Sequence, residues 1–348
     1  MGLTRVQFFK SMTQQGLALT FGDVRLCAGR SSVTAQAADT RSRFSKNVPL
    51  LTPITSAAMD TVTTGKMAIA MAKQGGIGVI HAGLSPEQQY HEVRKTKLHL
   101  NGRIEKPVTV DAADTMADVL SMCEEKGYGF RSFPVNNRQG ELVGLITYNE
   151  FELNIDRSKK VSDVMTEMAD VASADENLSI ADAHILMCKT KQKVILLLDK
   201  SKNLSGMYVL SDVVRILGGN PDSYNLDSNG RLRVAAAVPT DEGAIERITL
   251  MRKHLDVAVI DTAQGDSDFA IATLKKVKKQ FPDLDVVVGN ISNADSAREL
   301  AQAGADGIKV GQGPGSICTT RIETGIGTPQ VTAVQECAEA VKPYDIPV

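Results

Sequence analysis

Short apolar runs alternate with helical segments through the second half of the chain, and this rhythm limits the folds open to it. Apolar runs at 234–238, 257–260, 286–288 and 305–310 each lead into polar and glycine residues. The segments between and after them have the composition of helices, at 241–254, 269–280, 294–303 and 330–341. Strands joined through helices pair in parallel, with the helices outside the sheet.

The amino-terminal region of the chain repeats this unit. It has a strand-like run at 48–54, a helix-forming segment at 65–74, a Gly75-Gly76 stop and a second strand at 77–81. The alternation predicts an α/β fold, a (β/α)₈ barrel, with a doubly wound sheet as the alternative. We count about six complete strands and the start of a seventh at 346–348, whereas a closed barrel has eight. We therefore expect the barrel to be incomplete at the carboxyl end.

Between these regions the rhythm changes, and two similar halves are visible. Val110-Asp111 followed by Met116-Ala117-Asp118 resembles Ala174-Asp175 followed by Ile180-Ala181-Asp182. The halves indicate a tandem repeat of a small α/β module inserted into the barrel. The predicted organisation is a first barrel segment at 1–104, the inserted pair at 105–220, and a second, truncated barrel segment at 221–348.

The net charge and the cysteine content restrict the classes of binding partner and the cellular compartment that we expect. Lys and Arg total 39 against 41 Asp and Glu, a formal net charge of −2, which argues against nucleic acid or a membrane as partner. There is no apolar run of transmembrane length and no signal peptide. The five cysteines have no paired spacing, so we expect free thiols in a reducing cytoplasm, four of them as small apolar fillers.

The fifth cysteine, Cys318, lies in residues 311–320, Gly-Gln-Gly-Pro-Gly-Ser-Ile-Cys-Thr-Thr, directly after the strand-like run 305–310. Three glycines at alternating positions favour an open loop that a ligand can approach closely. Barrel enzymes carry their chemistry at the carboxyl ends of the strands. This position predicts a nucleophilic thiol, for which a lowered pKa is required.

Taken with four other segments, this loop resembles the IMP dehydrogenase / GMP reductase family. The segments are Ser56-Ala57-Ala58-Met59-Asp60-Thr61-Val62, Gly75 to His81, Asp261-Thr262-Ala263-Gln264-Gly265 and Gly289-Asn290. The inserted repeat resembles a pair of CBS modules. The resemblance implies oxidation of IMP to XMP with reduction of NAD, in guanine nucleotide synthesis, through a thioimidate on a cysteine. It also implies a homotetramer.

The resemblance also assigns roles to individual residues. Cys318 and Thr320 are the implied catalytic pair, with Thr320 helping to position the hydrolytic water. The implied IMP contacts are Ser56, Met59, Gly315 and Ser316. The implied NAD contacts are Asp261, Thr262, Ala263, Asn290, Gly311 and Gly313. A potassium ion on the backbone carbonyls of Gly313, Gly315 and Cys318 completes the implied site.

Several positions depart from the family pattern. The CBS nucleotide signature has Glu150 in place of Asp in the first copy and Val209 in place of a hydroxyl residue in the second, so we expect weakened purine nucleotide binding there. Gln312 replaces a usual aliphatic residue, and we expect it to point away from the nucleotide. With the barrel incomplete and the mobile flap absent, we expect the chain not to complete the dehydrogenase cycle.

Two other functions remain open at this point. GMP reductase shares the barrel and the cysteine loop but runs an NADPH-dependent reductive deamination of GMP to IMP. The second is a catalytically inactive nucleotide-sensing homologue, in which the inserted pair is the working region. The segment 261–265 and the inserted pair favour the dehydrogenase, whereas the intact Cys318 loop argues against the sensor.

Overall fold

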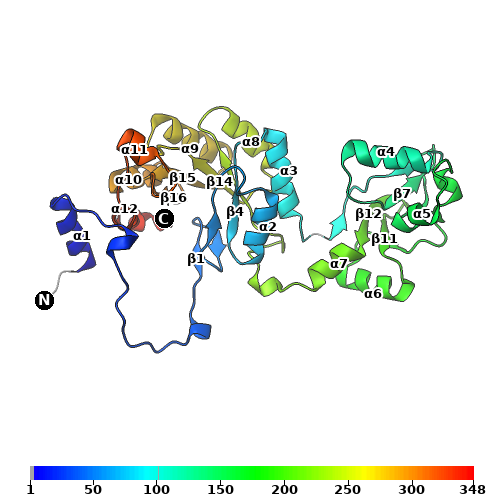
Figure 1. Cartoon of the computed structure of the whole chain (residues 1–348), viewed down its shortest axis with the longest axis horizontal. Helices are drawn as coiled ribbons and strands as arrows, with labels where there is room; N and C mark the ends of the chain where they lie inside the picture. Colours follow the sequence, from blue (N-terminus) through cyan, green and yellow to red (C-terminus); the bar gives the residue numbers. More distant parts are fainter. Residues whose placement is uncertain (1–3, 101) are drawn as a thin grey trace. The chain divides into compact units, whose positions relative to one another are not determined.

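The computed structural model describes residues 4–100 and 102–348 (Figure 1). The chain divides into two compact units. The first contains the residues up to His99 together with Asn220–Val348, and the second is Leu100–Gly219.

Among the described residues, the main sheet of the first unit has six parallel strands, in the order β3-β4-β13-β14-β15-β16. The strands are β3 (Thr55–Ser56), β4 (Ile77–Ile80), β13 (Ala235–Val238), β14 (Val257–Asp261), β15 (Asp285–Ile291) and β16 (Gly307–Val310). The helices are α2 (Gly65–Lys73), α3 (Pro86–Lys97), α8 (Gly243–Met251), α9 (Asp268–Gln280), α10 (Ala294–Gln302), α11 (Thr320–Thr324) and α12 (Gln330–Val341).

The sheet is of the barrel type and not doubly wound. Each strand pairs with the next strand of this unit along the chain, so the strand order never reverses. The larger apolar cluster packs helical residues on one face of the sheet, against alternate strand residues such as Ala236, Ile260 and Val288. The opposite face, with Ala237, Val259 and their neighbours, forms a separate apolar cluster without helical residues. A parallel sheet with helices on its outer face only is the arrangement of a (β/α) barrel.

Local signals explain where the helices begin and end. Helix α3 starts with a capping box, in which Ser85 Oγ accepts from the backbone N–H of Gln88 at 3.2 Å and Pro86 takes the first helical position. Helix α2 is followed by Gly75 with a φ of +83°, a conformation that costs glycine little. Gly78 then brings β4 against α2, because a Cβ there would lie 2.4 Å from Ala68 Cα.

The strand expected at 48–54 is wrong as a single element. The structure has β1 (Ser42–Arg43) paired antiparallel with β2 (Pro49–Leu50), and only β3 joins the barrel sheet. The backbone N–H groups of Leu51 and Thr52 both donate to Gly75 O, and Pro53 has no N–H to give. The chain therefore turns between the two strands. At the other end, Ile308 N–H donates to Pro347 O at 3.0 Å, where the sequence predicted the start of a further strand.

An amino-terminal helix, α1 (Arg5–Gln14), lies against α12. Arg5 pairs with Glu339 at 3.0 Å and Thr13 Oγ1 donates to Glu336 at 2.7 Å. Short 3₁₀ turns at Phe21–Asp23, Ala35–Ala37, Pro221–Ser223 and Lys342–Tyr344 complete this unit.

The second unit consists of two halves with one topology. Each half contains a four-stranded sheet, with the strand orders β6-β7-β8-β9 and β10-β11-β12-β5. In each sheet the first two strands pair in parallel, and the other two pairings are antiparallel. The strands are β5 (Arg103–Ile104), β6 (Val110–Asp111), β7 (Phe133–Asn136), β8 (Leu142–Ile146), β9 (Thr166–Glu167), β10 (Ser173–Asp175), β11 (Val194–Leu198) and β12 (Leu204–Val209). The helices are α4 (Met116–Lys126), α5 (Tyr148–Leu153), a 3₁₀ turn at Val161–Asp163, α6 (Ile180–Thr190) and α7 (Leu210–Leu217).

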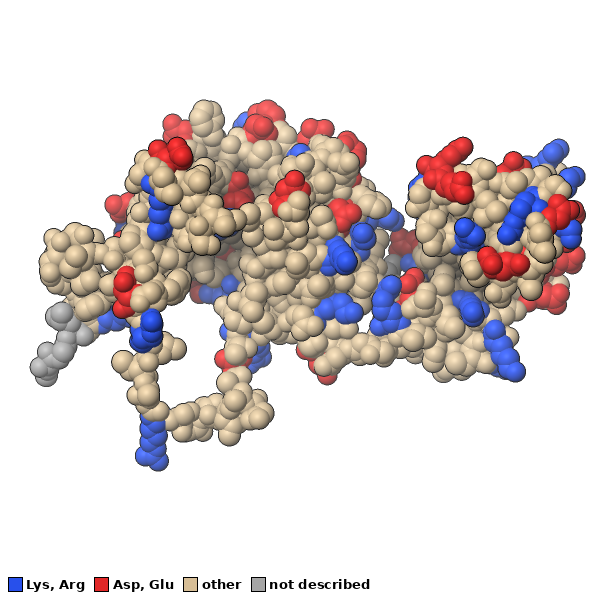
Figure 2. All heavy atoms as spheres, in the orientation of Figure 1, with Lys and Arg blue, Asp and Glu red and all other residues tan. Residues whose placement is uncertain are grey.

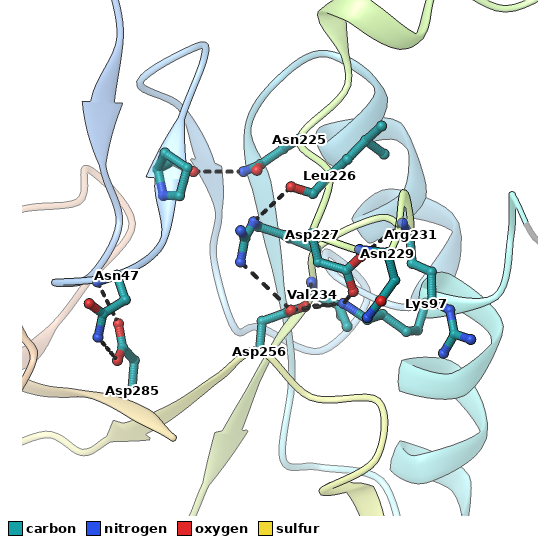
Figure 3. A network of polar contacts seen from close by, with 12 residues as sticks. Asn47, Lys97, Asn225, Leu226, Asp227, Asn229, Arg231, Val234, Asp256 and Asp285 are labelled. Carbon is teal, nitrogen blue, oxygen red and sulfur yellow. Dashed lines mark hydrogen bonds and ion pairs between the residues drawn. The ribbon is translucent and has the colours of Figure 1, made fainter. Parts of the chain in front are cut away.

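A buried ionic network lies at the amino ends of the barrel strands (Figure 3). Lys97 Nζ lies 2.6 Å from Asp227 Oδ2 and 2.8 Å from Asp256 Oδ1. Asn225 Nδ2 donates to Pro49 O at 2.9 Å and to Gly76 O at 3.0 Å. Lys97 is the last residue of α3, just before the chain leaves the first unit at His99. Asp227 lies shortly after the chain re-enters that unit at Asn220. The network therefore links the segments where the chain leaves and re-enters the first unit.

Figure 2 shows Lys and Arg side chains interspersed with Asp and Glu on the visible face of the molecule. This agrees with the near-zero net charge. Of the helices in the described residues, none combines the length and the apolar character needed to cross a membrane.

Candidate active site

The loop after β16 exposes Cys318 at the carboxyl end of the sheet. Gly311 and Gly313 have φ values of +134° and +63°, which side-chain-bearing residues rarely adopt. Residues from Pro314 to Thr319 are exposed, and Cys318 N–H donates to Gly315 O at 3.1 Å, which folds the tip into a turn. The sequence missed the short helix α11, which begins at Thr320 and fixes the far end of this loop.

The surroundings of Cys318 favour its thiolate. Its Sγ lies 3.2 Å from Thr320 Oγ1. Hydrogen bonds from the side chain and backbone of Thr320, aided by the charge of Arg321, hold the pKa of the Cys318 thiol below its usual range. The buried Cys337 is the opposite case, since burial raises its pKa to about 12. A thiol with a lowered pKa and open access is the reactive kind.

The sequence predicted that the other four cysteines are small apolar fillers, and the structure confirms this for two of them. Cys123 and Cys337 are buried, as predicted for apolar fillers. Cys27 and Cys188 are exposed, so that prediction was wrong for them. Spacing in the sequence could not separate these two pairs.

The ends of β14 and β15 bring the predicted NAD contacts together. The N–H of Thr262 donates to Gly289 O, and the N–H of Asn290 donates back to Thr262 O, each at 2.8 Å. Asp261, at the end of β14, forms an ion pair of 2.7 Å with Lys309 of β16. Lys309 was missed by the sequence reasoning, although a lysine in an apolar strand was the available signal.

A cavity of about 300 Å³ lies on the inner side of the sheet, and Ser56, Asp261 and Lys309 are among its lining residues. Ser56 is buried, and its Oγ has no hydrogen-bond partner within the described chain, so it is available to a ligand. Met59 is 50% exposed and is not plain core. Neither Met59 nor the residues 313–320 line this cavity.

For metals, residues 4–100 and 102–348 contain no group of three or more His, Cys, Asp or Glu side chains able to hold an ion. The predicted potassium ligands are backbone carbonyls, a different donor set. Of these, Gly315 O already accepts the N–H of Cys318.

The sheet is parallel and has helices on one face, and a thiol with a lowered pKa lies on a glycine-rich loop at the carboxyl ends of its strands. These features are typical of an enzyme of the barrel class. Comparison with known proteins is more specific. Residues 18–348 match the IMP dehydrogenase / GMP reductase domain. The inosine-5'-monophosphate dehydrogenases of Aquifex aeolicus and Escherichia coli K12 are 39% and 38% identical, over 95% of this chain and 67% of each relative.

Solved structures give a second comparison. GMP reductase from Trypanosoma brucei, in complex with guanosine 5'-triphosphate, is similar with a TM-score of 0.85 and 33% identity, over 96% of this chain and 81% of that one. A Cys→Ala variant of that enzyme, in complex with guanosine 5'-monophosphate, gives 0.84 and 34%, over 95% and 70%. The chain belongs to the IMP dehydrogenase / GMP reductase family, whose members are oxidoreductases of purine nucleotides.

Proposed function

We propose that this chain carries the nucleophile for the oxidation of IMP to XMP with reduction of NAD⁺, through a covalent intermediate on Cys318, as a step in guanine nucleotide synthesis. The observation that carries the proposal is the exposed Cys318 at the carboxyl end of β16, with its pKa lowered by Thr320. The similarity to dehydrogenases at 38 to 40% identity supports this choice of reaction.

The chemistry follows from the thiolate. Sulfur adds to C2 of the hypoxanthine ring, which makes that carbon tetrahedral. Hydride then leaves C2 for the nicotinamide, and a thioimidate remains on Cys318. Water adds to C2, the thiolate departs, and XMP is released with one proton. Splitting a difficult oxidation into addition, hydride transfer and hydrolysis is the general advantage of covalent catalysis.

The proposed contacts divide between the two partners. Ser56, Met59, Gly315 and Ser316 would bind IMP, with the unpartnered Ser56 Oγ and the exposed loop tip supporting this assignment. Asp261, Thr262, Ala263, Asn290, Gly311 and Gly313 would bind NAD. Thr320 would position the water that hydrolyses the thioimidate. Its closeness to Cys318 Sγ supports both this role and its effect on the thiol.

A potassium ion held by the carbonyls of Gly313, Gly315 and Cys318 would stabilise the loop conformation, since carbonyl oxygens suit a hard cation. We further propose that the enzyme assembles as a homotetramer, by similarity to its family.

GMP reductase is the second candidate. The likeness to the Trypanosoma brucei enzyme covers nearly the whole chain and favours it. In that reaction the same thiolate would add to C2 of GMP, and ammonia would leave after uptake of one proton. NADPH would then deliver hydride to C2, and the thiolate would depart to release IMP.

The inserted unit would bind a purine nucleotide as a CBS pair. A cavity of about 600 Å³ is lined by residues of both halves, including Thr147, Lys193 and Ser211. Glu150 already caps its own helix, accepting from Thr147 N at 2.7 Å, and Asp212 pairs with Arg215. These contacts support weak binding at both signatures. Equilibrium dialysis with ATP and GTP, with Lys193→Ala as control, tests this.

The function is tested by rapid mixing of the purified chain with IMP and NAD⁺, and separately with GMP and NADPH. Formation of NADH with IMP, lost in Cys318→Ala, supports the dehydrogenase. Consumption of NADPH with GMP, without formation of NADH from IMP and NAD⁺, identifies the chain as a GMP reductase. Neither reaction, in a folded protein that still binds nucleotide, would favour the sensing homologue.

A further inference from the structure

Gln312 occupies an unusual place for a polar residue. It is the second residue of the loop that carries Cys318, yet it is only 6% exposed. Burying an amide is unfavourable unless both its oxygen and its nitrogen find partners. The partners of Gln312 come from two other loops at the same end of the sheet.

The side chain of Gln312 connects these loops directly. Its Nε2 donates to Ala263 O at 3.1 Å and to Gln264 Oε1 at 2.6 Å, both in the loop after β14. Its Oε1 accepts from Ser292 Oγ at 2.6 Å, which follows β15. One amide therefore bridges the loops after β14, β15 and β16.

The backbone of Gln312 extends the connection toward the thiol. Its carbonyl accepts from Arg321 Nε at 2.9 Å, and Arg321 also donates to Thr328 O at 2.7 Å. Arg321 belongs to α11, which starts with Thr320, the hydrogen-bond partner of Cys318. A continuous chain of contacts thus runs from Ala263 through Gln312 and Arg321 to the helix beside Cys318.

We propose that Gln312 is a positioning residue that holds the thiol loop in register with the loop 261–266. This inference rests on the proposed function, in which the first loop presents the purine C2 and the second the nicotinamide. Hydride transfer needs its two carbons within contact distance, and a misplacement of about 1 Å can cost about 10²-fold in rate. Gln312 touches neither reactant in this proposal and acts through the loops.

Replacing Gln312 by leucine introduces an apolar side chain of similar size and removes all three side-chain hydrogen bonds. The buried Ser292 Oγ then loses its partner, and Ala263 O loses its donor, which favours separation of the loops. The Gln312→Glu variant still accepts from Ser292 but cannot donate to Ala263 O. It therefore removes the donation to the loop after β14 and keeps the contact with Ser292, while it adds a carboxylate charge.

The experiment compares wild type, Gln312→Leu, Gln312→Glu and a remote control, Gln335→Leu, on the full chain. In single-turnover mixing with IMP and NAD⁺, we expect Gln312→Leu to slow hydride transfer about 10²-fold. The pH profile of Cys318 alkylation by iodoacetamide should stay unchanged, because the Thr320 contact is intact. The rate of hydride transfer in Gln312→Glu should lie between the rates of wild type and Gln312→Leu. The rate in Gln335→Leu should match that of wild type.

Amide hydrogen exchange provides a readout that needs no turnover. The N–H of Gly265 donates to Asn290 O, and the N–H of Gly311 donates to Ile291 O, each at 2.8 Å. In Gln312→Leu we expect both amides to exchange faster together. Wild-type hydride transfer and wild-type exchange in Gln312→Leu would overturn the inference, and so would faster exchange confined to one loop. If wild type is inactive with both substrate pairs, the proposed function fails, and exchange alone decides the role of Gln312.

Discussion

Removing the ammonium group of Lys97 is the sharpest stability test that the structure offers. Its side chain is 6% exposed and is held between Asp227 and Asp256, whose side chains are 13% and 11% exposed. Burial raises the pKa of Asp256 despite the nearby Lys97. For Asp227, burial acts in the same direction, but the hydrogen bonds from Lys97 and the Arg231 backbone leave its pKa lowered.

The Lys97→Met variant leaves two largely buried carboxylates without their main cation. Breaking a buried ion pair on one side costs about 3–5 kcal/mol. For a unit of this size each kcal/mol lowers the melting temperature by about 2–4 °C, so we expect a drop of roughly 6–20 °C. Calorimetry of the full chain at neutral pH measures it.

Two further variants make the result specific. Lys95→Met removes an exposed lysine of the same helix, which lies 3.8 Å from Glu92, and should cost no more than about 1 kcal/mol. Lys97→Met/Asp256→Asn should recover some of the loss, because one of the two uncompensated charges is gone while Val234 N–H keeps an acceptor. A melting temperature of Lys97→Met equal to that of Lys95→Met would show that the ion pairs of Lys97 with Asp227 and Asp256 do not stabilise the fold.

The effect also has a predicted pH dependence. The folded pKa of Asp256 lies above its unfolded value, so the folded state binds this proton more tightly. The associated stability is present at low pH and is lost as pH rises through the folded pKa. Lys97 opposes this rise, so its removal raises the pKa of Asp256 further, and the stability deficit of Lys97→Met should shrink on mild acidification.

Three other outcomes follow from the geometry. Thr320→Val should move the pH profile of Cys318 alkylation to higher pH, while Thr320→Ser keeps it, as iodoacetamide kinetics would reveal. Gly78→Ala should destabilise the barrel by about 1–3 kcal/mol in urea unfolding, because the new Cβ meets the backbone of Ala68, whereas Gly29→Ala, with open space around it, should not. When the folded protein is alkylated and the sites are mapped by peptide mass spectrometry, Cys318 should be modified well before the buried Cys337.

Much of the barrel unit could be predicted from periodicity. Helix 330–341 was predicted with the bounds that α12 has, and the strand at 257–260 differs from β14 by one residue. These elements are long or fully buried, so their pattern is strong. The prediction of a strand at 48–54 failed because only Pro49 and Leu50 of this run lie in a strand, and the turn that follows depends on Gly75, which is distant in sequence.

The site was predicted only incompletely. The sequence placed the Cys318 loop and the polar residues after β14 at the carboxyl ends of strands, and the structure joins the two loops through Gln312. It could not give the bridge through Gln312 or the pairing of Lys309 with Asp261, because both join residues about fifty positions apart. Such contacts depend on strand order and register, which periodicity does not encode.

Intact-protein and peptide mass spectrometry after mixing with IMP and NAD⁺ tests whether Cys318 forms the covalent intermediate. We expect a nucleotide adduct on the peptide containing Cys318, formed together with NADH and absent in Cys318→Ala. A folded chain that makes NADH while Cys318 stays unmodified at every time sampled, or a Cys318→Ala variant that keeps wild-type activity, would contradict this expectation.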